Sequence, residues 1–416
     1  MMSFYADYAQ EMIWSYEDLL SDLNTLETTG RYIYERSTYR LLLRLIHSMA
    51  VGCPVTVLDG DLSPEELASL GIGCTDELYQ TVPTPCLALK SVSELMERIR
   101  SGQDSWSLGL FTSGTTGRPK LVHQTFESLT RNVRYGTKYA QDVWGLAYSP
   151  THIAGIQVFL QAFLNGNLIV DLFSKPNKLA AAEIVRRYGV NRISATPTYY
   201  RTLISQLKEP LTQVANLTFG GERFDSQLVE QLRTYFPNAV IRNTYASTEL
   251  GTLLQTEGET FTIPSWLQND IRISEDMELL IHRRFLGKVA GGGELSLIDD
   301  VWYPTGDVVE RADNGQFRFV HRKSELISVG GYKVNPNEVE DEIKRLDGVT
   351  DAVIKGRSNK MVGHILVAEI VLREDVSRET MARKISELPL QPWKIPRQVY
   401  FVDELYRNRS GKKSRL

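Results

Sequence analysis

Residues 110–120 read Leu110-Phe111-Thr112-Ser113-Gly114-Thr115-Thr116-Gly117-Arg118-Pro119-Lys120. An apolar strand here runs into small hydroxylated residues, two glycines and a cation. The glycines let backbone N–H groups turn toward one point, the hydroxyls add donors, and Lys120 adds positive charge. The stretch therefore predicts a strand and a loop that holds a polyphosphate. The alternative is a surface turn rich in threonine and glycine, although such turns rarely show hydroxyls, two glycines and Pro-Lys in this order.

This loop differs from the phosphate loop of kinases and GTPases, in which a Gly-Lys-Ser/Thr sequence closes the motif. Four residues on from Gly114 the chain reaches Arg118, and Pro119 stands before Lys120. A kinase-type phosphotransferase would need the missing pattern. A phosphotransferase is therefore an alternative function, which product analysis would distinguish by the formation of ADP.

Length and composition set the broad class. The 416 residues favour two or three domains, and 42% hydrophobic with 24% charged residues is typical of a globular enzyme. A net charge of −4 gives no reason to expect a nucleic-acid or membrane partner. The cysteines, Cys53, Cys74 and Cys86, are odd in number and match no zinc spacing, which favours reduced thiols in the cytoplasm. No signal peptide and no apolar run near the roughly 20 residues of a membrane span is visible.

Helix and strand patterns alternate along the first 250 residues, which favours α/β layers. We expect one helical region over residues 14–50, with Ser15 as a cap, and further helices at 179–187 and 226–236, the last capped by Asp225. Strands are expected at 54–59, 192–196 and 240–243. From about residue 259 short alternating segments, 278–282 and 293–298, predict antiparallel strands.

After residue 323 a smaller α+β unit is expected. Val339, Ile343 and Leu346 form a helical stripe, and residues 352–355 and 365–372 are strand candidates. The predicted domains are therefore a large N-terminal domain over 1–322 and a small C-terminal domain over 323–416. The boundary rests on this change of content, because the sequence shows no linker of biased composition.

The phosphate loop resembles the signature loop of the adenylate-forming superfamily, which includes acyl- and aryl-CoA ligases, adenylation domains of peptide synthetases, and luciferases. Further segments resemble that superfamily in the expected order, and the resemblance runs from about residue 14 to the C-terminus. The resemblance implies an α/β fold. A large N-terminal domain of layered α/β subdomains, abridged at its start, carries a small β-barrel-like part and precedes a small, mobile α+β domain.

Residues 243–249, Asn-Thr-Tyr-Ala-Ser-Thr-Glu, resemble the family's Tyr-Gly-x-Thr-Glu segment, with Ala246 in place of glycine. The resemblance implies that Tyr245 packs near adenine and that Thr248 donates to the α-phosphate. A carboxylate beside a triphosphate makes electrostatic sense only with a cation between them, so Glu249 is expected to bind Mg²⁺. A solvated surface acid is the alternative for Glu249.

Three further segments resemble nucleotide-binding and thiol-binding parts of the family. Gly220, Gly221 and Glu222 are expected to flank adenine. Asp307, in a Tyr-Pro-Thr-Gly-Asp segment, is expected to bind the ribose hydroxyls, and Arg322 the ribose or phosphate. Gly330 and Gly331 resemble the turn that lines the thiol tunnel after the lid rotates. At the hinge Ser324 and His321 depart from the family pattern, which puts the energetics of the hinge in doubt.

The C-terminal Gly411-Lys412 pair resembles the family's closing motif, and Lys412 aligns with its catalytic lysine. A cation is needed because a carboxylate that attacks a phosphate suffers like-charge repulsion. A basic tail is the alternative, and the neighbouring Lys413 could exchange roles with Lys412. His152 resembles a residue at the wall between acyl pocket and nucleotide, although a core or surface histidine is as good a reading.

The predicted function is ATP-dependent activation of a carboxylic acid to acyl-AMP with release of pyrophosphate, followed by transfer to a thiol. CoA is the favoured acceptor, and the phosphopantetheine of a carrier protein supplied in trans is an alternative. A degenerate protein that binds nucleotide without turnover is a third reading. Residues 147–155 contain no acid to pair with a substrate ammonium, so an aryl or short acyl acid is favoured. The expected cofactors are ATP, Mg²⁺ and the thiol, and the oligomeric state stays open.

Overall fold

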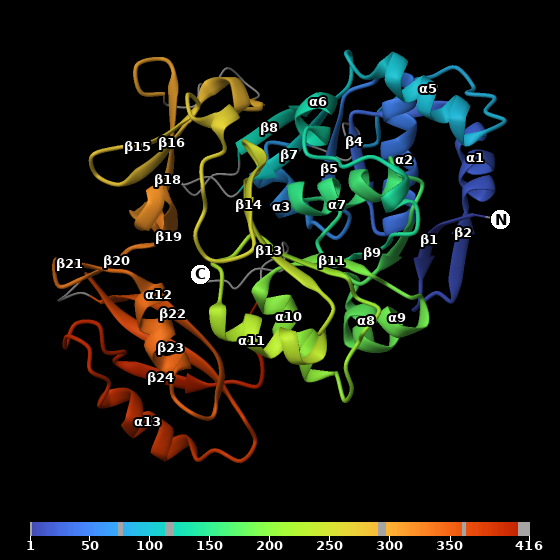
Figure 1. The fold of residues 1–416 in the computed structure, drawn as a ribbon. Helices are drawn as coiled ribbons and strands as arrows, with labels where there is room; N and C mark the ends of the chain where they lie inside the picture. Colours follow the sequence, from blue (N-terminus) through green and yellow to red (C-terminus); the bar gives the residue numbers. More distant parts are fainter. Residues whose placement is uncertain (1, 74–77, 113–119, 290–296, 360–362, 407–416) are drawn as a thin grey trace. The chain divides into compact units, whose positions relative to one another are not determined.

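The computed structural model describes residues 2–73, 78–112, 120–289, 297–359 and 363–406 (Figure 1). The chain divides into two compact units. Unit 1 comprises residues 1–263 and 282–303, and unit 2 comprises residues 264–281 and the chain from residue 304 onward. A domain boundary between residues 322 and 323 stays a prediction. Among the described residues, no helix has both the length and the apolar character needed to cross a membrane.

The larger sheet of unit 1 has eight strands in the order β14-β13-β12-β11-β9-β10-β1-β2. Its six central strands run parallel, and β2 and β14 are antiparallel edges. The bounds are β1 Ser3–Asp7, β2 Met12–Ser15, β9 Val143–Leu146, β10 Leu168–Asp171, β11 Arg192–Ala195, β12 Asn216–Phe219, β13 Val240–Ser247 and β14 Gly251–Thr256. Because the carboxyl ends of parallel strands meet at one edge, the loops that follow β9, β11, β12 and β13 are neighbours.

A second sheet of unit 1 has five strands in the order β17-β8-β7-β5-β4. Strands β4, β5 and β7 are parallel, whereas β8 and β17 run antiparallel to their neighbours. The bounds are β4 Tyr32–Glu35, β5 Val55–Asp59, β7 Ser107–Thr112, β8 Lys120–Thr125 and β17 Lys288–Val289. A two-stranded ribbon of β3 (Thr28–Gly30) and β6 (Thr81–Pro83) accompanies it.

The expectation of one helical region over residues 14–50 is wrong in its middle. Helices α1 (Tyr16–Asn24) and α2 (Thr38–Val51) are present, but β3 and β4 lie between them. The intervening segment is rich in threonine and tyrosine, which fit a pleated surface better than a helix, and Ile33 is buried where β4 pairs with β5. Ser15 does cap α1, because its hydroxyl accepts from the backbone N–H of Asp18.

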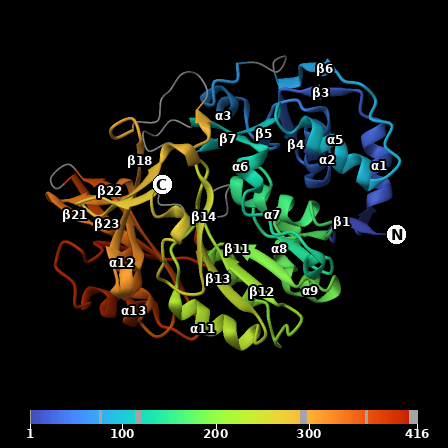
Figure 2. The same cartoon turned by 45° about the horizontal axis from the view of Figure 1, so that its top comes forward.

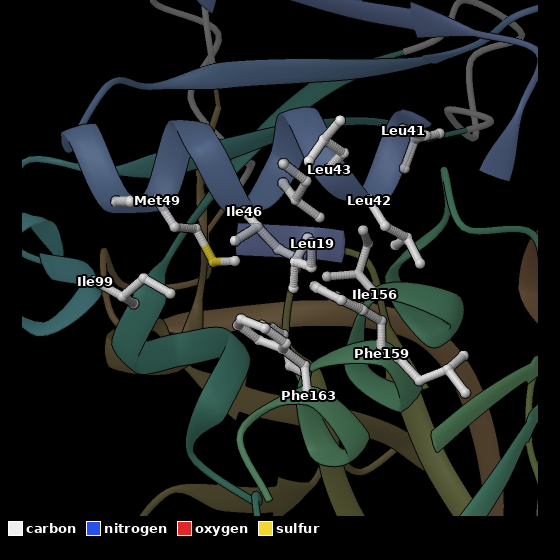
Figure 3. Close-up of a cluster of buried hydrophobic side chains, with 14 of the residues drawn as sticks. Leu19, Leu41, Leu42, Leu43, Ile46, Met49, Ile99, Ile156, Phe159 and Phe163 are labelled. Atoms are coloured by element: carbon white, nitrogen blue, oxygen red, sulfur yellow. The ribbon is translucent and has the colours of Figure 1, made fainter. Parts of the chain in front are cut away.

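Helices fill the space between the two sheets of unit 1. They are α1, α2, α5 (Val92–Gly102), α6 (Phe126–Thr130) and α7 (Ile153–Phe163), and they share one apolar cluster with strands from both sheets. Figure 3 shows Leu19 of α1 and Ile46 of α2 pointing toward Phe159 and Phe163 of α7. Each such side chain contributes about 1.5–3 kcal/mol on burial. This shared apolar layer of helices fixes the position of one sheet relative to the other.

The other face of the eight-stranded sheet is covered by α9 (Ala181–Arg187), α10 (Pro197–Ser205) and α11 (Ser226–Tyr235), with the short α8 (Lys175–Leu179) beside them (Figures 1 and 2). Asp225 caps α11 as predicted, because its carboxylate accepts from the N–H groups of Gln227 and Leu228. Helix α3 (Pro64–Ser69) packs near β5. Layered α/β architecture is confirmed.

An antiparallel sheet has the strand order β15-β16-β18-β19. It lies in unit 2, except for residue 282 of β16 and residues 302–303 of β18, which belong to unit 1. Its strands are β15 Ile271–Ile273, β16 Glu278–His282, β18 Trp302–Arg311 and β19 Phe317–Arg322. The strand predicted at 278–282 is confirmed. The one predicted at 293–298 falls mostly outside the described residues.

The rest of unit 2 is a small α+β body, as predicted. Strands β20 Ile327–Val329, β21 Tyr332–Val334, β22 Val349–Asn359, β23 Gly363–Leu372 and β24 Gln398–Phe401 form one sheet, with helices α12 Pro336–Lys344 and α13 Arg378–Ser386. Val339 and Ile343 of α12 are fully buried against that sheet, and Leu346 packs at the edge of the same cluster.

Candidate active site

The predicted phosphate loop is anchored by a hairpin in unit 1. Its last residue before the loop, Thr112 of β7, pairs with Lys120, the first residue of β8. Leu108 and Leu110 are buried, so β7 is fixed in the sheet. The five residues predicted to hold phosphate between these strands, Ser113, Gly114, Thr115, Thr116 and Gly117, lie outside the described residues. Their contacts stay predictions, whereas the positions of both ends of the loop are set.

The Gly220-Gly221 segment follows β12 at the carboxyl edge of the eight-stranded sheet. The Tyr148 hydroxyl donates to the carbonyl oxygen of Gly220 at 3.1 Å. A Cβ on Gly220 would lie 3.0 Å from that hydroxyl, and Gly221 has φ of +79°. Both positions therefore favour glycine, and a flat ring could approach the bare backbone here. Burial raises the pKa of Tyr148, which keeps its hydroxyl protonated as a donor.

Glu222, predicted to flank adenine, contacts the start of α10. Its carboxylate accepts from the backbone N–H of Thr198 at 3.1 Å and from the Thr198 hydroxyl at 2.7 Å. An acid at a helix N-terminus is stabilised by the helix dipole. Glu222 therefore fixes the loop after β12 against the loop after β11, and its contact with adenine stays a prediction.

Tyr245 lies near the end of β13, and Thr248 and Glu249 follow that strand at its turn into β14. Tyr245 is buried, and Thr248 and Glu249 are half-buried. The side-chain amide of Gln124, on β8, donates to the carbonyl oxygens of Thr248 at 2.7 Å and Glu249 at 3.0 Å. The phosphate-loop hairpin and the predicted magnesium ligand thus meet within unit 1. Sequence reasoning missed Gln124.

His152 is the N-cap residue of α7 and is half-buried. The segment before it is fixed by hydroxyl contacts, because Thr151 donates to the carboxylate of Asp59 at 2.5 Å and also meets the Ser149 hydroxyl at 2.8 Å. Asp59 ends β5 in the other sheet. The sequence argument against a substrate ammonium considered only residues 147–155, and the fold adds Asp59 to that neighbourhood.

Asp307 and Arg322 face each other across β18 and β19 in unit 2. The Arg322 guanidinium donates to both carboxylate oxygens of Asp307, from Nε at 2.7 Å and from Nη2 at 3.2 Å. Asp307 is only 6% exposed. This bidentate pair orients the carboxylate. Contact of either residue with ribose stays a prediction.

Lys323, the residue after Arg322, is also held inside unit 2. Its ammonium donates to Asp276 at 2.5 Å and to Glu278 at 2.8 Å, and the second oxygen of Glu278 accepts from the N–H of Gly306 at 2.7 Å. The hydrogen bond to Asp276, followed by that to Glu278, raises the pKa of Lys323. The predicted hinge is thus bordered by ion pairs from Lys323 to Glu278 of β16 and to Asp276 in the turn before β16.

The glycines predicted to line the thiol passage connect β20 to β21. Gly330 has φ of +57° and Gly331 φ of +89°, so both adopt the left-handed conformation. A Cβ at either position would meet no other described atom within 4 Å. The turn is therefore open, and a side chain there would project outward. Lys412, the predicted catalytic lysine, lies outside the described residues.

The arrangement of acidic side chains in the described residues suits a Mg²⁺ ion that is bound jointly by the protein and by the phosphates of a nucleotide. No group of three or more histidine, cysteine or acidic side chains is arranged to hold a metal in the part of the chain that the structure describes. Mg²⁺ is commonly bound by one or two carboxylates together with substrate phosphates. The half-buried Glu249, tied to the strand that leaves the phosphate loop, suits that arrangement.

Comparison with known proteins identifies the family. The family described as "AMP-binding enzyme" matches residues 33–277, and "AMP-binding enzyme C-terminal domain" matches residues 338–412. A (methyl-dioxo-octahydro-indenyl)propanoyl:CoA ligase of Mycobacterium tuberculosis is 29% identical over 334 residues, 74% of this chain and 64% of that protein. A 2-succinylbenzoate–CoA ligase of Staphylococcus epidermidis is 27% identical over 333 residues, 74% of this chain and 68% of that protein. This chain thus spans about two thirds of the length of these relatives.

Solved structures show the same fold. The o-succinylbenzoate CoA synthetase of Bacillus subtilis, solved with its acyl-adenylate intermediate, matches with a TM-score of 0.69 at 20% identity. The match covers 100% of this chain and 94% of that one. The same enzyme solved with ATP and magnesium matches with a TM-score of 0.69 at 18% identity, over 100% of this chain and 96% of that one. The predicted fold class is confirmed.

Proposed function

Because the chain belongs to the family of AMP-binding enzymes, we propose that it activates a carboxylic acid with ATP and transfers the acyl group to CoA. In the first step a carboxylate oxygen attacks the α-phosphorus of ATP, and the bond to pyrophosphate breaks. In the second step a thiolate attacks the acyl carbon, and AMP leaves. The relatives reported above are named as CoA ligases, which supports CoA as the acceptor.

The meeting of the phosphate-loop hairpin with the Thr248–Glu249 segment is the observation that carries this proposal. Lys120 and the loop would neutralise the phosphates, and Thr248 would donate to the α-phosphate. Glu249 would hold Mg²⁺, which when bound draws charge from the phosphate oxygens. Gly220 and Gly221 would receive adenine beside the buried Tyr148. A loop that only binds the phosphate of a ligand, without Mg²⁺, would not need an acidic residue such as Glu249 held beside it.

The residues of unit 2 would complete both steps. Asp307 and Arg322 would position the ribose, and Lys412 would offset the repulsion between carboxylate and phosphate. Gly330 and Gly331 would line the thiol passage once residues 323–416 have moved as a lid. We place the reaction in the cytoplasm, since Cys53 and Cys86 are free thiols in the described chain.

The proposed substrate is a small aryl or acyl acid without an α-amino group. The segment around His152 supplies no acid, and the carboxylate of Asp59 already accepts from Thr151. One relative is named for 2-succinylbenzoate, an aryl acid. Residues 147–155 thus offer a substrate ammonium no acidic partner, and Asp59 is the acid through which an amino-acid substrate would have to bind.

The test is a panel of aryl, acyl and amino acids supplied with ATP, with Mg²⁺ and then with CoA or a phosphopantetheine carrier protein. We expect acid-dependent pyrophosphate exchange, AMP and pyrophosphate as products, and a thioester of CoA. Formation of ADP would identify a phosphotransferase. Nucleotide binding without products would identify a protein that does not turn over, and a thioester only on the carrier would change the acceptor.

A further inference from the structure

Gln124 is a fully buried polar residue that the chemistry above does not use. It lies on β8, four residues after Lys120, and is 1% exposed. Its amide nitrogen donates to the carbonyl oxygens of Thr248 and Glu249. Its amide oxygen accepts from the Ser128 hydroxyl at 2.6 Å. Every one of these bonds joins the sheet of the phosphate loop to the segment of the predicted magnesium ligand or to the helix beside it.

A second donor completes the same connection. The backbone N–H of Gly287 donates to the Glu249 carbonyl oxygen at 2.8 Å, so this oxygen accepts two hydrogen bonds. Gly287 immediately precedes β17, which pairs with β8. A Cβ on Gly287 would lie 2.6 Å from the Gln124 amide nitrogen, so the amide and the bare backbone are packed against each other.

These bonds hold the backbone of Glu249 and not its carboxylate. The carbonyl oxygens of Thr248 and Glu249 are fixed relative to β8, and β8 begins at Lys120, where the loop ends. The backbone that carries the side chains of Thr248 and Glu249 is therefore held in one position, from which these side chains can contact a ligand. Burial strengthens this effect, because a carbonyl oxygen that loses its hydrogen-bond donor away from water is destabilised.

We propose that Gln124 is a positioning residue that sets the distance between Lys120, at the start of β8, and the backbone of Glu249, and so tunes the affinity for Mg²⁺·ATP. The proposal rests on the function proposed above, because it assumes that this edge of unit 1 binds the nucleotide. Gln124 acts through the backbone and touches neither metal nor nucleotide.

The first test replaces Gln124 with methionine, which keeps the length and apolar volume of the side chain but removes both donors. We expect the Mg²⁺ concentration for half-maximal ATP binding to rise about 10–100-fold, as for other residues that orient a metal ligand. In pyrophosphate exchange kcat should fall about 10²-fold, as expected for a shift of about 1 Å in a catalytic group. KM for the carboxylic acid should hardly change.

A matched control separates positioning from stability. Asn167 is also a buried amide, 2% exposed, and it donates to the carbonyl oxygen of Tyr139 at 2.8 Å, in a part of unit 1 without a predicted site residue. Asn167→Leu should lower the melting temperature without moving the Mg²⁺ titration. Ser128→Ala keeps both amide donors and loosens only their orientation, so its Mg²⁺ shift should be smaller than that of Gln124→Met.

The outcomes separate this proposal from the proposed function. If Gln124→Met is folded and its Mg²⁺ titration in ATP binding matches wild type, Gln124 is only structural and the inference fails. Equal Mg²⁺ shifts in Gln124→Met and Asn167→Leu would overturn it as well. If wild type binds Mg²⁺·ATP but shows no exchange with any acid, the proposed function fails, and the titration still decides the role of Gln124. A wild type that binds no Mg²⁺·ATP contradicts both.

Discussion

Glu249 and Asp307 are both acids predicted to serve the nucleotide, but the two units hold them in different ways. In unit 1 the backbone carbonyl of Glu249 is fixed by Gln124 and Gly287, and its carboxylate takes no part in those bonds. In unit 2 the carboxylate of Asp307 is itself engaged, because Arg322 donates to both of its oxygens. The first arrangement leaves full negative charge for a cation, whereas the second compensates the charge and leaves lone pairs for neutral hydroxyls.

The contrast also concerns how easily each region can rearrange. The Glu249 segment is held by hydrogen bonds from the side-chain amide of Gln124, which is 1% exposed. Lys323 forms ion pairs with Asp276 and Glu278, and the side chains of Lys323 and Asp276 are 41% and 65% exposed. Exposed ion pairs exchange readily with water and salt. A firmly held segment in unit 1 and exposed ion pairs near residue 323 are compatible with the proposed movement of residues 323–416 between the two half-reactions. Four substitutions test this division.

Lys412→Ala should have the largest effect, since it removes the charge that unit 2 is proposed to bring to the first step. We expect adenylation to fall about 10²–10³-fold, while transfer from a supplied acyl-adenylate is spared. Pyrophosphate exchange and thioester formation from the adenylate measure the two steps. If Lys413→Ala loses exchange and Lys412→Ala keeps it, the assignment is wrong by one residue.

Gly331→Leu should affect only the second step. A side chain on the open turn would obstruct the thiol, so thioester formation should fall by roughly 10–10²-fold while pyrophosphate exchange survives. The φ of +89° makes the substitution strained by about 1–2 kcal/mol, so thermal melting must first show a folded protein. If both half-reactions fall together in a folded variant, a rotating small domain is the wrong explanation. If neither falls, the acceptor enters elsewhere.

Glu249→Gln keeps the shape of the side chain and its backbone bonds but removes the charge. We expect Mg²⁺ affinity and the adenylation rate to fall about 10–100-fold, with a melting temperature close to wild type. A titration of exchange activity with Mg²⁺ at fixed ATP measures the shift. An unchanged titration would remove Glu249 from the metal site.

Asp307→Asn should have the smallest effect, because Asp307 is proposed to bind the ribose hydroxyls and no metal ion. Loss of charge-assisted bonds to ribose should raise the ATP concentration for half-maximal exchange by about tenfold. The Mg²⁺ titration at saturating ATP should stay at its wild-type value. A Mg²⁺ shift equal to that of Glu249→Gln would mean that the two acids do not have distinct roles.

Local sequence patterns were sufficient for much of the fold. The caps at Ser15 and Asp225, the strand that leads into the phosphate loop and the buried stripe of α12 depend on residues a few positions apart, so the sequence displays them directly. The strands at 28–35 were missed because β4 is defined by its pairing with β5, which begins at Val55, and not by a strong local pattern.

The missed site residues share one cause. Gln124 contacts a segment 124 residues away, and Asp59 contacts Thr151 from 92 residues away. In its local sequence, each of these residues is an ordinary polar side chain within or at the end of a strand, and nothing nearby indicates its distant partner. Only the packing of two sheets on shared helices brings these pairs together. The predicted roles of the site residues themselves came from resemblance to a family, together with the charge that Glu249 and Lys412 carry.

The two-residue strand β17 has a consequence for synthesis of the chain on the ribosome. Strand β8 is paired with β7 at residue 125, but its other edge and the second donor to Glu249 arrive only with Gly287–Val289. A nascent chain therefore carries an open edge on β8 while more than 150 further residues are translated, and open edges invite pairing with other chains. An expression fragment that stops at residue 277, where the first family match ends, would keep that edge permanently. A fragment that extends to residue 303 would close it.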